Sequence, residues 1–252
     1  SGSTLKAGAN NASTTFSGTI TGTGGVTKTG TGTLTLTGAN TYTGSTKVSS
    51  GKLVVNGSIT STVTLDGGTL GGSGTVGGVS VASGATVAPG NSIGTLTVSG
   101  NVSFASGSTY QVEVNAAGQS DRIAASGSAS ITGGTVQVLA ENGNYAASTN
   151  YTILTASGGV SGTFSSVSSN LAFLTPSLSY GGTTVTLTMT RNDTSFGPSG
   201  GSSGGGSGTS GGTSGGGTSS GGASSGGGSS GGTSLRVAAV NACLTIRSSS
   251  EW

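Results

Sequence analysis

The sequence has 252 residues, of which 53 are Gly, only 6% are charged, and none is His; the net charge is +2. Without a cluster of Lys or Arg, we expect no nucleic-acid partner, because that binding needs basic side chains close together. The absence of His removes the commonest general base and transition-metal ligand, so we expect no cofactor and no metal site.

Features outside the repeats place limits on the class of protein. Cys243 is the single cysteine, which excludes a disulfide within the chain. No apolar run approaches the ~20 residues of a membrane helix. The sequence begins at Ser1 without a signal-peptide pattern, and we therefore expect an interior or mature fragment.

Short alternating runs begin in the first third of the chain. Residues 1–25 are polar and rich in Gly, with one alternating run over 16–20. Residues 25–57 then read as strand, turn, strand, turn, strand, with alternate Leu and Val side chains pointing inward. The Gly, Asn and Ser residues between these runs favour sharp turns.

The same pattern continues through residues 65–114, where Thr95–Val98 is one of several runs of three to five residues. Strands this short cannot each bury a core, so they must stack on one another. A period near 20 residues made of short strands and turns predicts a solenoid, with about seven rungs over residues 1–140. We expect an all-β fold, a solenoid of stacked parallel strands.

The pattern changes in the last part of the chain. Residues 141–193 contain longer apolar runs, and Gly181-Gly182 between two of them predicts an antiparallel hairpin that caps the solenoid. Residues 194–234 have the composition of a flexible Gly/Ser/Thr linker, and residues 235–252 are an unassigned tail.

Two short motifs resemble catalytic or phosphate-binding signatures. The segment 90–94 (GNSIG) matches the G-x-S-x-G nucleophile elbow, but a strand-like run follows it and no His is present, so a turn is favoured. The segment 72–77 matches G-x-G-x-x-G but opens no helix, so we expect no phosphate site.

The acidic and aromatic residues allow two further interpretations. A pair of carboxylates from different rungs could form a glycosidase site, but a structural role such as turn bonding or ion pairing is favoured, because the acids are few and Asp121 stands next to Arg122. The tyrosines could form a sugar-binding stripe, although core packing is favoured. These residues are Asp66, Glu113, Asp121, Glu141, Asp193 and Glu251, and Tyr42, Tyr110, Tyr145, Tyr151 and Tyr180.

These segments together resemble a known family. Residues 32–57, with GTLTLTGANTYTG at their start, resemble the passenger-associated transport repeat of bacterial autotransporters. Residues 88–96 (APGNSIGTL) are similar to a segment near the C-terminus of those passengers. The segments 119–123, 133–136, 151–154 and 171–174 resemble the autochaperone-like junction that follows, and the resemblance covers about residues 25–192.

The resemblance implies a right-handed parallel β-helix that type V secretion carries through the periplasm and across the outer membrane, to be displayed at the cell surface or released. It also implies two partners that this chain lacks, its own translocator β-barrel and the upstream passenger. In this family the C-terminal segment of the passenger is thought to fold first.

We therefore expect a non-enzymatic stalk and folding template that supports vectorial folding. The alternatives are a surface adhesin that binds host glycans or sister passengers, and, less favoured, a β-helical polysaccharide-degrading enzyme. We expect no catalytic residue. The residues predicted to form the core and the template are Leu34, Leu36, Val48, Leu53, Val55, Leu96, Val98, Ile123, Val136, Val138, Ile153, Leu154, Phe164, Phe173, Leu174 and Leu187.

Overall fold

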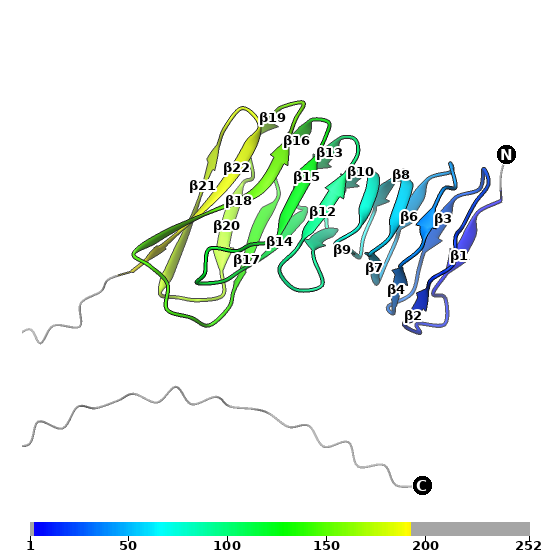
Figure 1. Cartoon of the computed structure of the whole chain (residues 1–252), viewed down its shortest axis with the longest axis horizontal. Coiled ribbons are helices and arrows are strands. Elements are labelled where there is room, and N and C mark those ends of the chain that lie inside the picture. The colour runs from blue at the N-terminus through cyan, green and yellow to red at the C-terminus, as the bar shows by residue number, and fades with distance from the viewer. Residues whose placement is uncertain (1–2, 193–252) are drawn as a thin grey trace, which may run out of the picture. The chain divides into compact units, whose positions relative to one another are not determined.

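The computed structural model describes residues 3–192, so the predicted linker and tail lie outside the described residues. This part of the chain is all-β and contains no helix. Its strands stack side by side along one direction from β1 to β22 (Figure 1). Strand pairing is parallel until the last hairpin, so the predicted β-helix is confirmed.

The pairing divides the β-helix into three faces. Face 1 consists of β1 (Leu5–Ala7), β3 (Val26–Lys28), β6 (Thr46–Val48), β8 (Ser58–Leu65), β10 (Thr75–Val81), β13 (Val102–Phe104), β16 (Ala129–Ile131) and β19 (Val160–Gly162). Face 2 consists of β5 (Ala39–Asn40), the first residues of β8 and β10, β12 (Thr95–Val98), β15 (Arg122–Ala125) and β18 (Ser148–Ala156).

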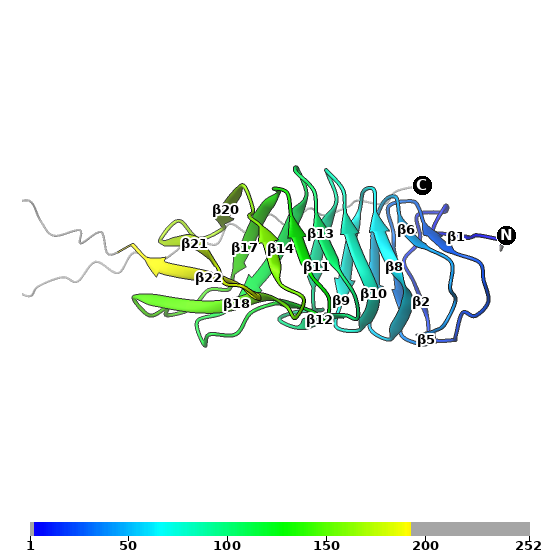
Figure 2. The same ribbon diagram turned by 90° about the horizontal axis from the view of Figure 1, so that it is seen from above.

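Face 3 is the continuous eight-stranded sheet that Figure 2 shows in part. It consists of β2 (Thr14–Phe16), β4 (Thr33–Leu36), β7 (Lys52–Val55), β9 (Thr69–Gly72), β11 (Thr86–Pro89), β14 (Thr109–Val114), β17 (Thr135–Ala140) and β20 (Ser166–Ser169). From β4 onward, each rung of the chain crosses face 3, then face 2, then face 1.

Buried and more exposed side chains alternate along the strands, because one side of each strand faces the core. On face 3 the inward residues lie in register from rung to rung, and those from Leu34 to Val136 are buried. Each Val or Leu buried in this way contributes about 1.5–3 kcal/mol before conformational entropy is subtracted. The column is Leu34, Leu53, Leu70, Val87, Tyr110 and Val136.

The rungs lengthen toward the C-terminus. Successive residues of this column are separated by 19, 17, 17, 23 and 26 residues, and Val167 follows Val136 by 31. The predicted period near 20 therefore describes only the first rungs. The parallel stack also continues past residue 140, because β18, β19 and β20 pair with the rung before them.

The C-terminal end is closed by a hairpin of β21 (Leu174–Tyr180) and β22 (Thr184–Arg191), in which β22 pairs antiparallel with β18. Its side chains Val185, Leu187 and Met189 are completely buried. The predicted capping hairpin is confirmed.

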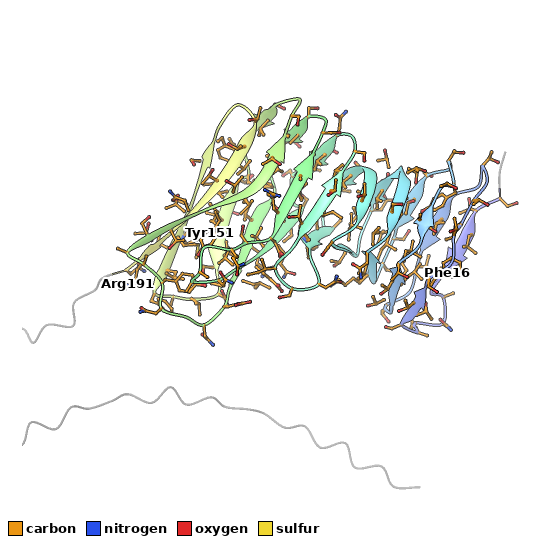
Figure 3. All side chains as sticks on the ribbon, in the orientation of Figure 1. Phe16, Tyr151 and Arg191 are labelled. Carbon is orange, nitrogen blue, oxygen red and sulfur yellow. The ribbon has the colours of Figure 1, made fainter. Side chains whose placement is uncertain are left out.

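The N-terminal end is open. A pocket of about 250 Å³ lies there, lined mostly by apolar side chains of the first two rungs, including Ile20 and Leu36. Leu5 is 51% exposed and Phe16 is 42% exposed. Figure 3 shows Phe16 at this end, and Tyr151 and Arg191 at the opposite end.

One predicted core residue is not in the core. Phe173 is 44% exposed, because it lies in the turn that precedes β21, while its neighbour Leu174 is buried. The other residues predicted for the core are buried.

Candidate functional site

Three loops lie at successive rungs of one corner, where the chain passes from face 3 to face 2. They are residues 90–94, 115–121 and 141–147, which follow β11, β14 and β17. The same corner takes only two residues in the earlier rungs, as at Asn56-Gly57 and Ser73-Gly74. We call residues 90–94 the GNSIG loop and the group of three loops the long-loop corner.

Asp121 holds this corner together. Its Oδ1 accepts a hydrogen bond of 2.8 Å from the Gly94 amide, and its Oδ2 accepts one of 2.9 Å from the Glu113 amide. The Asp121 amide in turn donates to the Glu113 carbonyl at 2.8 Å. Turn bonding is therefore the role that the structure gives this carboxyl, whereas Asp66 forms an ion pair with Lys47.

The electrostatics of Asp121 follow from its burial, since only 1% of the residue is exposed. Removal from water, with a smaller contribution from the charge of Glu113, raises the pKa of the Asp121 carboxyl to about 7. The two amide hydrogen bonds and the charge of Lys52 lower this pKa in part. The Asp121 carboxyl therefore changes charge near neutral pH.

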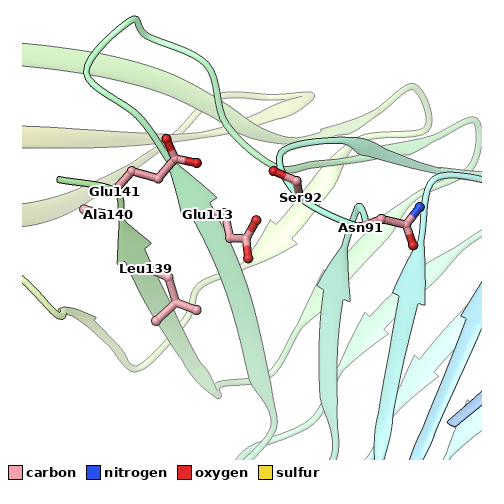
Figure 4. Close-up of a pocket in the computed structure, with 6 residues that line it drawn as sticks. All are labelled: Asn91, Ser92, Glu113, Leu139, Ala140 and Glu141. Carbon is pink, nitrogen blue, oxygen red and sulfur yellow. The ribbon is translucent and has the colours of Figure 1, made fainter. Parts of the chain in front are cut away.

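A pocket of about 370 Å³ opens at the same corner (Figure 4). The GNSIG loop contributes Asn91 and Ser92 to it, and Glu113 and Glu141 line the other part. Leu139 and Ala140 complete the lining. The two carboxylates thus share one pocket, but none of the lining residues is an aromatic that could stack on a sugar ring.

The tyrosines are structural. Tyr42, Tyr110, Tyr145 and Tyr151 are buried, and Tyr180 packs against the core, so they form no exposed stripe. The core-packing interpretation of these residues is the one that the structure supports.

The tyrosine hydroxyls fasten the C-terminal rungs to one another. Tyr110 donates to the Ile153 carbonyl, and Tyr151 donates to the Asn115 carbonyl at 2.7 Å. The Tyr145 hydroxyl lies between two acceptors, the Glu141 carbonyl at 2.9 Å and the Val114 carbonyl of the preceding rung at 3.2 Å. Burial raises the pKa of all three, that of Tyr145 to about 12, which keeps these hydroxyls protonated as donors.

Three aromatic rings fill the core beneath this network. The ring centroids of Phe104 and Phe164 are 5.1 Å apart in an edge-to-face arrangement, and Tyr110 lies 5.6 Å from Phe104. The Phe164 amide donates a hydrogen bond to the Tyr180 hydroxyl. The capping hairpin is thereby attached to the last rung.

A buried lysine lies on face 1 near the other end. Lys28 is almost completely buried, and its Nζ donates to the carbonyls of Thr29 at 2.6 Å, Gly30 at 2.9 Å and Ser50 at 3.3 Å. Its ammonium therefore binds the turns of two successive rungs. This role could not be predicted from the sequence, because Lys28 stands at an inward position of an ordinary strand.

The described residues hold no group of three or more His, Cys, Asp or Glu that could bind a metal. Nor does this part of the chain contain a helix with the length and hydrophobicity of a membrane span.

Comparison with known proteins agrees with this architecture. The model of the passenger-associated transport repeat matches residues 26–55, which run from β3 to the end of β7. An "Extracellular serine protease" of Serratia marcescens is 45% identical over 115 residues, which cover 42% of this chain and 11% of that relative. The chain thus spans a small part of the relative's length, and its resemblance to an autotransporter passenger is confirmed.

Proposed function

We propose that this segment of an autotransporter passenger is a non-enzymatic stalk whose C-terminal rungs serve as the template on which the preceding rungs fold. In this mechanism the C-terminal rungs form first. Each earlier rung then adds backbone hydrogen bonds and apolar burial to a surface that is already ordered.

The difference between the two ends of the β-helix is the observation that supports this proposal. The C-terminal end is closed by the β21–β22 hairpin and fastened by tyrosine hydroxyls. The N-terminal end presents an apolar pocket with Leu5 and Phe16 exposed. Such an end suits the addition of a further rung, which would cover these side chains and pair with the edge strands β1 and β2.

Export and partners belong to the same proposal. An upstream part of the passenger would supply the added rung, and an outer-membrane translocator would deliver the chain from the periplasm to the cell surface. The relative with 45% identity is named as extracellular, which supports a secreted or surface location for this chain.

The proposal also holds that this chain has no catalytic activity of its own. The relative's name assigns protease activity to that protein, of which the matched part covers 11%. The present chain has no His, so a Ser-His-Asp triad could not be assembled from its residues alone.

Two matched substitutions test the template role. Leu154→Ala removes a buried side chain from a C-terminal rung, and Leu53→Ala removes an equally buried one near the N-terminus. Each should lower stability by about 2–5 kcal/mol. If the C-terminal rungs form the folding nucleus, Leu154→Ala slows refolding of the chain from urea, whereas Leu53→Ala mainly speeds unfolding. Equal effects on refolding, or the reverse order, would contradict the proposal.

A second candidate function is adhesion to host glycans or to sister passengers. A row of hydroxyl side chains in register on face 3 favours it, since such a row offers hydrogen bonds at the ~4.8 Å strand spacing. The row is Thr69, Thr86, Thr109, Thr135 and Ser166.

The adhesion candidate predicts that cells displaying the chain clump in proportion to its surface density. The double variant Thr86→Lys and Thr109→Lys should abolish this clumping through charge repulsion and loss of the hydroxyls. Clumping that persists in the variant would contradict a role for this row.

A further inference from the structure

The Asp121 carboxyl is a buried acid without a cationic partner among the described residues. The side chains whose charges act on it are Glu113 of β14, which disfavours its ionisation, and Lys52 of β7, which favours it. Arg122 is exposed, and the buried Tyr110 hydroxyl is neutral. A buried carboxylate without a paired cation is costly, so burial favours the neutral acid.

Asp121 fastens only one end of the GNSIG loop. The first end is held elsewhere, since Gly90 exchanges two backbone hydrogen bonds with Gly72 and Asn91 Nδ2 donates to Asn56 Oδ1 at 2.9 Å. At the second end, Gly94 donates its amide hydrogen to Asp121 and accepts a hydrogen bond from the Arg122 amide. Both contacts of this end lie at the start of β15.

We propose that Asp121 is a proton-controlled latch: with the carboxyl neutral and buried, the C-terminal end of the GNSIG loop is closed on the β14–β15 rung, and ionisation of the carboxyl favours an open loop in which it is hydrated. The moving part is the segment Ser92 to Gly94, while Gly90 and Asn91 stay attached to the earlier rungs.

The direction of the effect follows from proton linkage. The closed state holds the Asp121 proton up to about pH 7, whereas a hydrated aspartate loses it near 3.8. The closed state therefore binds more protons between these values, and its advantage decreases as the pH rises from about 4 to 7. Above pH 7 both states are ionised and the balance no longer changes.

The latch also controls the pocket at the long-loop corner. Ser92 lines that pocket together with Glu113 and Glu141, and it belongs to the segment that moves. Opening the loop would widen the pocket and add the Asp121 carboxylate to its wall. A rise in pH would thus make the corner both larger and more negative.

Nuclear magnetic resonance of the full chain tests the latch. We expect the carboxyl carbon of Asp121, identified by its loss in Asp121→Asn, to titrate with a midpoint near 7. The hydrogen-exchange protection of the Gly94 amide, corrected for the intrinsic pH dependence of exchange, should fall at least tenfold between pH 5 and pH 8.

Two variants provide the comparison. Asp121→Asn has no carboxyl to ionise, so its Gly94 protection should not change over this range. Asp66→Asn, at the exposed ion pair with Lys47, should behave as the unaltered chain does. If Asp121→Asn does not fold, the carboxyl titration and Gly94 exchange of the unaltered chain still decide the matter. A midpoint near 4, or Gly94 protection that is constant with pH, would overturn the latch.

Discussion

The Tyr180 hydroxyl accepts a hydrogen bond of 2.9 Å from the Phe164 amide, which joins the capping hairpin to the aromatic cluster of the core. We predict that Tyr180→Phe lowers the free energy of unfolding by about 1–3 kcal/mol, because the Phe164 amide loses its acceptor. Urea unfolding followed by circular dichroism measures this change. A variant as stable as the unaltered chain would show that the bond contributes nothing to the attachment of the cap.

Phe164 and Phe173 lie nine residues apart in very different surroundings. Phe164 is 7% exposed and packs on Phe104, whereas Phe173 is 44% exposed. Phe164→Ala should therefore cost about 3–5 kcal/mol of stability. Phe173→Ala serves as the control and should change stability by no more than about 0.5 kcal/mol. Thermal unfolding of both variants would show which of them loses more stability, and a larger loss at Phe173 would contradict its surface placement.

Gly90 and Gly118 share the same positive φ of +82°. Ala at Gly118 would meet open space, but at Gly90 its Cβ would lie 2.9 Å from Asp121 Oδ1 and would crowd the Ser92 carbonyl. Gly118→Ala should cost about 1–2 kcal/mol, the backbone strain alone. Gly90→Ala should cost more because of the added overlap, as measured by urea unfolding. Equal losses would mean that the GNSIG loop relaxes around the new methyl group.

Lys28 and Lys47 lie on neighbouring strands of face 1 but differ in burial. Lys28→Met should lower stability by about 1–3 kcal/mol, because carbonyls that accept from the buried ammonium lose this donor. Lys47→Met removes an exposed ion pair with Asp66 and should cost less than about 1 kcal/mol. Chemical denaturation of both variants at pH 7 provides the measurement. A Lys28→Met variant as stable as the unaltered chain would indicate that water replaces the ammonium as the donor to these carbonyls.

Overall stability should depend on pH through Asp121. Since burial raises the pKa of this carboxyl from 3.8 to about 7, its contribution is greatest below pH 4 and is lost as the pH rises to about 7. The expected loss is about 1–4 kcal/mol, seen as a lower urea midpoint. Asp121→Asn should remove this part of the pH dependence. A midpoint that rises from pH 4 to pH 7 in the unaltered chain would contradict the assignment.

The repeating part of the fold could be predicted from the sequence, because a half-buried strand needs alternate apolar residues and a solenoid needs them at a regular period. The alternation around Leu34, Leu36, Leu53 and Val55 carries this information directly. Phe173 was assigned to the core wrongly because it stands in a run of four apolar residues, 171–174, where alternation gives no direction.

The site could be predicted only in part. A turn at the GNSIG loop follows from local sequence, and so does a structural role for the few acids, but the hydrogen-bond partner of Asp121 does not. Gly94 precedes Asp121 by 27 residues, and the carbonyl that Tyr110 binds lies 43 residues away. These distances depend on the lengths of the long loops, which no period of the sequence encodes.

The long-loop corner shows where this chain tolerates added length. The corner has two residues after β4, β7 and β9, five after β11, and seven after β14 and β17. Over the same rungs the turns that lead from face 1 to face 3 stay at three or four residues. The strand register of face 3 is kept from rung to rung. A doubling of loop length costs only about 0.6 kcal/mol in closure entropy. Foreign peptides grafted at Gly118, where the space around the loop is open, would therefore project from the rod at a fixed height set by their rung.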